Sequence, residues 1–195
     1  MLLSHAVTAR TFNATGEAAE MALVKNFLRV SHTYDDETVI PMAVEAALSY
    51  CESCGNVAYV DCTVAALFDD IGDCGVALPL TALRSLTTVE RMADGVFTVL
   101  AATAYDVTQT GTENVPAQLY INDGVSPSGV TAGAGYRVTY QAGLSDEINN
   151  LPQRLQAGVL LAVNHIYAHR NEQNPDKSFP RSVADLVTIN RAPVL

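Results

Sequence analysis

The sequence predicts an α+β fold, mainly an α-helical bundle with a β-rich insertion between the second helix and the long C-terminal helix. Apolar residues recur at helical spacing in two stretches, one near the start of the chain and one in its last third. Between them, from Asn56 onward, the spacing changes to two, and β-branched and turn residues predominate. We therefore expect residues 1–55 and 145–178 to form the bundle, residues 56–144 the insertion, and residues 179–195 a separate C-terminal tail.

Two helices are expected before the insertion. The first runs from Glu17 to about Val30, with Thr15 as a suitable cap. The second follows the acidic residues 35–37, which suit a helix N-terminus, and it ends near Gly55. The apolar positions that define the two helices are Met21, Val24 and Leu28 in the first, and Val39, Ala43, Ala46 and Tyr50 in the second.

The third predicted helix, residues 155–170, is apolar on more than one face. One stripe is formed by Leu151, Leu155, Val159, Ala162 and Ile166, and other faces carry Leu160, Leu161, Val163 and Tyr167. A helix of this kind must be covered from more than one side. The cover is either the core of a single chain or a set of neighbouring subunits, and the sequence leaves both open. Interspersed polar residues argue against a membrane span.

The insertion contains several short predicted strands. They are residues 57–68, 83–92, 97–100, 105–108, 117–121 and 136–140. The second and third are joined across Ala93-Asp94-Gly95, where Asp-Gly indicates a hairpin turn. Two loops, residues 109–116 and 122–135, are rich in Gly, Ser, Thr, Asn and Pro, which makes them candidate contact loops.

Composition excludes some classes of function. The 195 residues include 11 basic and 21 acidic side chains, for a net charge of −10. A basic DNA-binding surface is therefore not expected, and the acidity favours solubility and repels polyanions. Residues 1–6 lack the charged region and long apolar run of a secretory signal, so we expect synthesis in the cytoplasm and no association with membranes.

Four cysteines raise the question of a metal or redox site. Cys51, Cys54, Cys62 and Cys74 are separated by two, seven and eleven residues, and four thiolates can surround a zinc ion. However, the second pair is not C-x2-C, and Cys62 falls in a predicted strand. The motif around Cys51 closes a helix, whereas the thiol pKa is lowered where such a motif opens one. Reduced thiols are the favoured interpretation.

Two other clusters were considered for catalysis. His165 and His169 are four residues apart on a helix, but the Glu that a metalloprotease places beside the first His is replaced by Ile166. Asp69, Asp70 and Asp73 lie in a loop with two glycines, which favours a solvated turn. A small metal-dependent hydrolase that uses His165, His169 and the carboxylate of Asp69 or Asp70 is an alternative. No nucleophile elbow or phosphate loop is found, and we expect no cofactor.

The tail is the last feature that needs a partner. Residues 179–195 carry seven large apolar side chains in a segment too short to form its own core. These residues are Phe179, Val183, Leu186, Val187, Ile189, Val194 and Leu195. They must pack either on the rest of the chain or on another protein.

Four groups of residues, in order along the chain, carry a resemblance to a known family. They are Phe27-Leu28-Arg29-Val30 before Asp35-Asp36; Leu78-Pro79-Leu80 with Leu83-Arg84-Ser85-Leu86; Val138-Thr139-Tyr140-Gln141-Ala142-Gly143; and Leu151-Pro152 with Tyr167-Ala168-His169-Arg170. In this order and spacing, over roughly residues 18–190, the chain resembles the head-tail connector, or adaptor, proteins of long-tailed double-stranded-DNA phages and gene transfer agents. The cysteine cluster and the lack of Trp depart from the family pattern.

The resemblance implies a structural protein without catalysis. In that family twelve copies form a ring in the virion neck, between the portal and the stopper or tail terminator, and DNA passes through the lumen without specific binding. For this chain it implies that the tail docks on the portal through Phe179, Val183, Leu186, Val187, Val194 and Leu195. It also implies that the insertion meets the distal partner through Asp123, Val125 and Val130. Another minor virion protein, of the tail-completion or capsid kind, is the alternative within the same particle.

Overall fold

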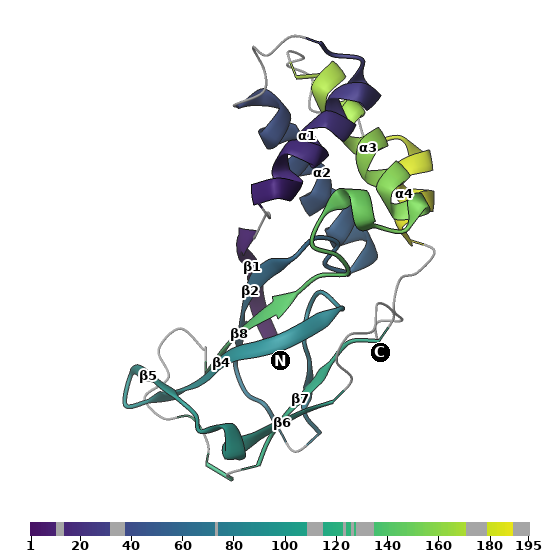
Figure 1. Cartoon of the computed structure of the whole chain (residues 1–195). Helices are drawn as coiled ribbons and strands as arrows, with labels where there is room; N and C mark the ends of the chain where they lie inside the picture. Colours follow the sequence, from purple (N-terminus) through teal and green to yellow (C-terminus); the bar gives the residue numbers. More distant parts are fainter. Residues whose placement is uncertain are drawn as a thin grey trace. The chain divides into compact units, whose positions relative to one another are not determined.

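The structure is a computed structural model. It describes residues 1–10, 14–31, 38–72, 74–108, 115–122, 124–125, 127, 135–170 and 179–188. The chain divides into two compact units, one formed by Met1–Thr11 with Val60–Leu144 and the other by Phe12–Tyr59 with Ser145–Leu195. Among the described residues, the first unit contains two antiparallel sheets and the second contains four α-helices, so the predicted α+β class is confirmed (Figure 1).

The helical unit is arranged around one central helix. Its elements are α1 (Ala14–Leu28), α2 (Val39–Gly55), the short 3-10 turn η2 (Ile148–Asn150), α3 (Gln153–Ala168) and α4 (Arg181–Thr188). Helix α3 contacts α1, α2 and α4, and both Val159 and Leu160 are buried although consecutive residues lie about 100° apart around a helix. Other helices of the same chain therefore cover α3 on more than one side, as the sequence predicts. No helix in the described ranges is long and apolar enough to cross a membrane.

The β-rich unit contains a five-stranded and a three-stranded sheet. The first has the order β1 (Leu2–Arg10), β2 (Cys62–Phe68), β8 (Tyr136–Ala142), β4 (Leu83–Ala93) and β5 (Val96–Val99). The second has the order β3 (Val76–Ala77), β7 (Gln118–Ile121) and β6 (Tyr105–Thr108), and the 3-10 turn η1 (Ala102–Ala104) precedes β6. Neighbouring strands are antiparallel throughout.

Strict alternation in β2 and β8 builds the core of this unit. Every second residue of each strand is buried, and the buried residues are Cys62, Val64, Ala66 and Phe68 in β2, and Tyr136, Val138, Tyr140 and Ala142 in β8. They lie directly opposite one another, so one face of the pair is continuous apolar surface. The Tyr140 hydroxyl donates a hydrogen bond to the Pro79 carbonyl, so this buried polar group is satisfied.

The hairpin predicted at Asp94-Gly95 is confirmed. Both residues have positive φ, 50° and 83°, as a two-residue turn with the twist of the flanking strands requires.

Strand β1 differs from the prediction, which assigned residues 1–55 to the helical bundle. Residues 2–10 instead pair with β2, and two register shifts interrupt the alternation that would have indicated a strand in the sequence. The predicted strand 57–68 also begins later, at Cys62.

A bidentate ion pair ties β4 to β8. The Arg137 guanidinium donates to Glu90 through Nε at 2.5 Å and Nη2 at 2.7 Å, and these hydrogen bonds lower the pKa of the Glu90 carboxyl. A carboxyl group with a lowered folded-state pKa stabilises the fold above its unfolded-state pKa, and this contribution is lost as the pH falls through the folded-state value. The pair should therefore matter at neutral pH and not in acid.

We expect Glu90→Gln to lower the free energy of unfolding by about 1 kcal/mol at pH 7, because two charge-assisted hydrogen bonds are weakened. The difference from the unmodified protein should shrink as the pH falls, since the wild-type carboxylate is then protonated. Urea unfolding between pH 7 and pH 3 measures this, with Asp185→Asn, which removes the same charge from an exposed position on α4, as the control. A difference that does not change with pH would contradict the assignment.

Candidate assembly surfaces

Helix α4 packs tightly on the helical unit through two buried valines. Val183 and Val187 are fully buried. Gly158 of α3 allows this approach, since a Cβ there would lie 2.9 Å from Val187 Cγ1. Gly55, the last residue of α2, would place a Cβ 3.2 Å from the Val187 carbonyl oxygen. Both valines were expected to dock on a partner, but in the structure their side chains belong to the core of their own unit.

The start of the tail is held by aromatic contacts. Phe179 stacks on Tyr50 of α2, with ring centroids 3.7 Å apart and an angle of 15° between the planes. The same ring lies 5.1 Å from His165. Phe179 remains half-buried, as does Leu186, so these two residues keep accessible surface for a partner. Val194 and Leu195, the other two tail residues in the predicted portal contact, lie outside the described residues.

Helix α4 also presents a polar outer face. Arg181, Ser182 and Asp185 are exposed, on the side opposite the buried valines. A partner that docks here would meet one positive and one negative charge together with the accessible parts of Phe179 and Leu186. The arrangement suits a mixed polar and apolar interface rather than a purely hydrophobic one.

Of the three residues predicted to contact the distal partner, the structure describes Val125. Val125 has 51% of its surface exposed, and its backbone is held in place, since its carbonyl accepts hydrogen bonds from Arg91 Nη1 at 3.1 Å and from the Tyr136 hydroxyl at 3.4 Å. An exposed apolar side chain on a fixed backbone is a suitable contact point, because little order is lost on binding. Asp123 and Val130 lie outside the described residues.

The His and Asp clusters do not form a metal site in the described part of the chain. The rings of His165 and His169 are 4.6 Å apart and edge to face in the helical unit, whereas Asp69 and Asp70 belong to the β-rich unit, and Asp73 is not described. Among the described residues, no group of three or more His, Cys, Asp or Glu side chains could hold a metal ion.

The cysteines are likewise dispersed. Cys51 and Cys54 lie in the last turn of α2, as the sequence indicated, while Cys62 is in β2 and Cys74 is exposed. No disulfide links these four residues, all of which the structure describes. Burial raises the pKa of the Cys51 thiol to about 12, with smaller contributions from Cys54 and Glu52, so it stays protonated at neutral pH. A protonated thiol is neither a nucleophile nor a good metal ligand.

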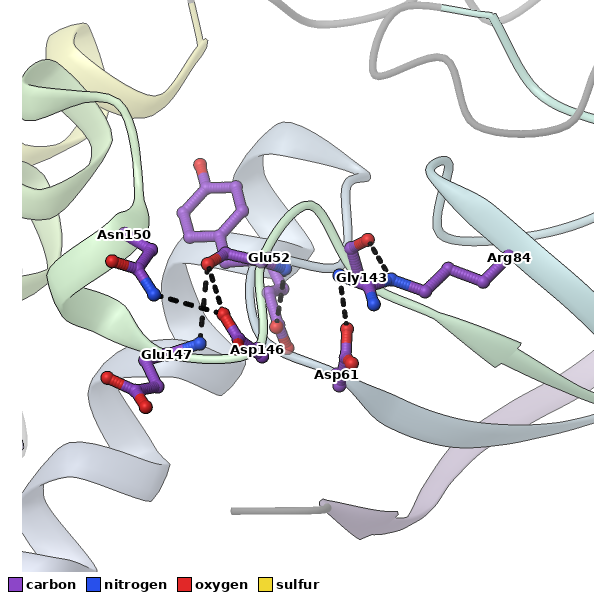
Figure 2. Close-up of polar contacts among 9 residues, drawn as sticks. Glu52, Asp61, Arg84, Gly143, Asp146, Glu147 and Asn150 are labelled. Carbon is purple, nitrogen blue, oxygen red and sulfur yellow. Dashed lines mark hydrogen bonds and ion pairs between the residues drawn. The ribbon is translucent and has the colours of Figure 1, made fainter. Parts of the chain in front are cut away.

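Two polar clusters were not anticipated as contacts (Figure 2). In the β-rich unit, Arg84 donates from Nε to the Gly143 carbonyl at 2.9 Å, and its Nη2 lies 2.9 Å from Asp61 Oδ1. A Cβ at Gly143 would lie 2.3 Å from that oxygen and 2.7 Å from the Asp61 Cα, so the position requires glycine. Arg84 and Gly143 each belong to one of the motifs that carry the family resemblance. Their presence in those motifs is the signal in the sequence that could have indicated this contact.

The second cluster lies in the helical unit. Glu52 of α2 accepts a hydrogen bond from the Tyr59 backbone N–H at 2.9 Å, and the Tyr59 carbonyl accepts one from the Ser145 N–H at 3.1 Å. Asp146 accepts one from the Asn150 side chain at 3.1 Å. Glu52 is buried, so its bond to the backbone compensates part of its desolvation. This network fixes the segment after α2 beside the segment before α3.

The fold has counterparts among components of virion particles. One chain in a structure of the virion of the native gene transfer agent (GTA) particle matches with a TM-score of 0.69 and 17% identity, over 99% of this chain and 98% of that chain. Chains in structures of the neck of the GTA particle, empty with C6 symmetry and native with C12 symmetry, each match with a TM-score of 0.67 and 19% identity, over 100% of this chain and 97% of the other. At these identities the likeness establishes the fold.

Comparison by sequence gives no match. No family model matches the chain, and no curated protein does. The similarity to the chains of the GTA particle structures therefore lies in the fold, over nearly the full length of both chains.

The packing of α4 predicts a difference between two truncations. Removing residues 179–195 takes away Val183 and Val187 and exposes the core that they cover, so we expect a loss of stability of about 3 kcal/mol or more. Removing residues 189–195 leaves α4 complete and should change stability by less than about 0.5 kcal/mol. Thermal and urea unfolding of the two variants measure this. Equal stabilities would show that α4 does not contribute to the core.

Proposed function

We propose that the chain is a head-tail adaptor of a tailed phage or gene transfer agent. In this role it forms a dodecameric ring in the virion neck, between the portal and the stopper or tail terminator, and lines the channel through which DNA leaves. The protein is made in the host cytoplasm, acts as a structural component and has no catalytic role.

One observation carries this proposal. The chain shares its fold with chains from GTA neck structures, over 100% of this chain and 97% of each of those chains. One of those necks has C12 symmetry and the other C6, and both symmetries are compatible with a closed ring of twelve copies. Function does not follow from fold in general, so the charge and the surfaces of this chain must also suit the role.

The charge of the chain suits a DNA channel. Proteins hold DNA by neutralising phosphates with Lys and Arg, and this chain has 11 such residues against 21 Asp and Glu. Twelve copies, each with a net charge of −10, would surround the DNA with a repulsive potential. DNA would then slide through the lumen without being retained.

The two predicted contact surfaces fit this role after one revision. On the portal side, we assign the contact to Phe179, Leu186 and residues 189–195, and we treat the buried Val183 and Val187 as the residues that hold α4 in position. On the distal side, Val125 is the described contact, together with Asp123 and Val130.

A map of the particle neck tests the proposal directly. Cryo-electron microscopy of particles that contain this chain should place it as a twelvefold ring between the portal and the stopper, with residues 179–195 at the portal. Placement elsewhere in the virion would favour another minor virion protein of the tail-completion or capsid kind. A neck map without the chain would contradict the adaptor role.

Portal binding can also be measured in solution. We expect Leu186→Asp, and separately removal of residues 189–195, to weaken binding to the portal protein of the same particle at least tenfold, about 1.4 kcal/mol per site. The physical reason is the burial of a charge in one variant and the loss of contact area in the other. Val125→Asp, which introduces the same charge at an exposed position, should bind the portal normally. Equal weakening in all three variants would contradict the assignment.

A further inference from the structure

Strand β1 is an unusually unprotected edge of the five-stranded sheet. It is nine residues long, it pairs with β2 alone among the described strands, and every residue from Leu2 to Ala9 is exposed. Natural proteins protect long edge strands with charged residues, with Pro or β-bulges, or by covering them with other segments. Residues 2–10 contain no Lys, Glu, Asp or Pro, their charged residue is Arg10 at the end of the strand, and residues 4–7 pair without interruption between the two register shifts. A strand of this kind invites the addition of another strand.

The core face of the sheet also continues onto β1 without cover. Leu2 lies opposite Phe68 and Val7 opposite Val64, so both side chains share the face on which β2 is fully buried. Phe68 and Val64 are completely inaccessible, yet Leu2 and Val7 keep 37% and 36% of their surface exposed. The fully buried face of the sheet therefore ends at β2 and does not extend over β1. A partner would cover both the edge of β1 and its exposed apolar face.

The opposite edge of the same sheet has matching properties. Strand β5 follows the Asp94-Gly95 turn, and it pairs with β4 alone among the described strands (Figure 1). Val96 and Val99 are 66% and 60% exposed, and residues 96–99 carry no charge. The strand is held in position by Phe97, whose ring centroid lies 4.6 Å from the Arg137 guanidinium carbon.

We propose that the β1 edge of one copy pairs with the β5 edge of the next, so that the five-stranded sheets of neighbouring subunits join head to tail. A closed ring of identical subunits requires two different surfaces that fit each other, and the two ends of one sheet provide them. The choice of this arrangement, rather than β1 pairing with β1 in a twofold dimer, rests on the proposed ring function. Strand addition also supplies backbone hydrogen bonds that satisfy both edges.

The distribution of charge favours a second copy of this chain as the partner that pairs with the β1 edge. Copies with a net charge of −10 repel one another, so they can approach most easily where carboxylates are absent. Neither β1 nor β5 contains Asp or Glu, and β1 contributes His5 and Arg10. In contrast, β6, an edge of the three-stranded sheet, contains the exposed Asp106. The two ends of the larger sheet are thus suited to self-association in an otherwise acidic chain.

Thiol cross-linking of the purified full-length chain tests the pairing. Cys54 and Cys74 are first replaced by Ser, since these two are the accessible thiols. One protein then carries Ala6→Cys on β1 and another Val99→Cys on β5, both at exposed positions on the face of the sheet opposite its core. We expect a short bifunctional thiol reagent to join the two proteins when mixed and neither protein to itself. A double variant with both cysteines should give a ladder of higher oligomers.

Matched variants separate this pairing from other contacts. A mixture of Ala6→Cys with Ser182→Cys, an exposed position on α4, should not cross-link. Adding Val96→Lys to the Val99→Cys protein should reduce its cross-linking to the Ala6→Cys protein at least tenfold, whereas adding Val125→Lys should not. Absence of the mixed product would overturn the proposal, as would efficient joining of the Ala6→Cys protein to itself.

The experiment does not depend on the location of the chain in a particle. A specific β1 to β5 product would uphold the pairing even if a neck map excluded the chain from the neck. A neck ring whose subunits touch through other surfaces, together with no mixed product, would overturn the pairing and leave the adaptor role intact.

Discussion

The antiparallel pairing of β2 with β8 is the constraint on which the β-rich unit depends. Seven consecutive residue pairs join the two strands without a register shift, whereas the β1–β2 and β4–β8 pairings each contain two. A slip of one residue would turn the buried side of either strand to solvent, so the apolar alternation permits one register. The same pairing places the end of β8 beside the start of β2, where Gly143 approaches the Asp61 backbone too closely for any side chain.

Small residues play the corresponding part in the helical unit. Gly158 and Gly55 bring α4 close enough for Val187 to be buried, and this decides which tail residues can reach a partner. A docking segment that is anchored on its own chain loses less conformational freedom on binding than an unstructured one. In the proposed role the tail therefore combines two tasks in one short helix: its inner side completes a core, and its outer side would contact another protein.

Assembly by an acidic chain requires that attraction be concentrated in a few places. Apolar and uncharged edges can associate where the overall charge opposes contact, and the acidic remainder keeps DNA from adhering. In the proposed neck ring these two properties would act together, because the subunits need to hold one another firmly while the DNA moves past them.

The sequence by itself determined the α+β class, the three longer helices and several strands, since periodicities of 3.6 and two report which residues face a core. The Asp94-Gly95 hairpin and the cover of α3 on several faces were also predictable, because turn chemistry and apolar content are local properties. Tertiary structure alone decided the location of β1, whose register shifts hide its period. It also decided that Val183 and Val187 are buried in their own chain, because an apolar side chain cannot indicate which surface covers it.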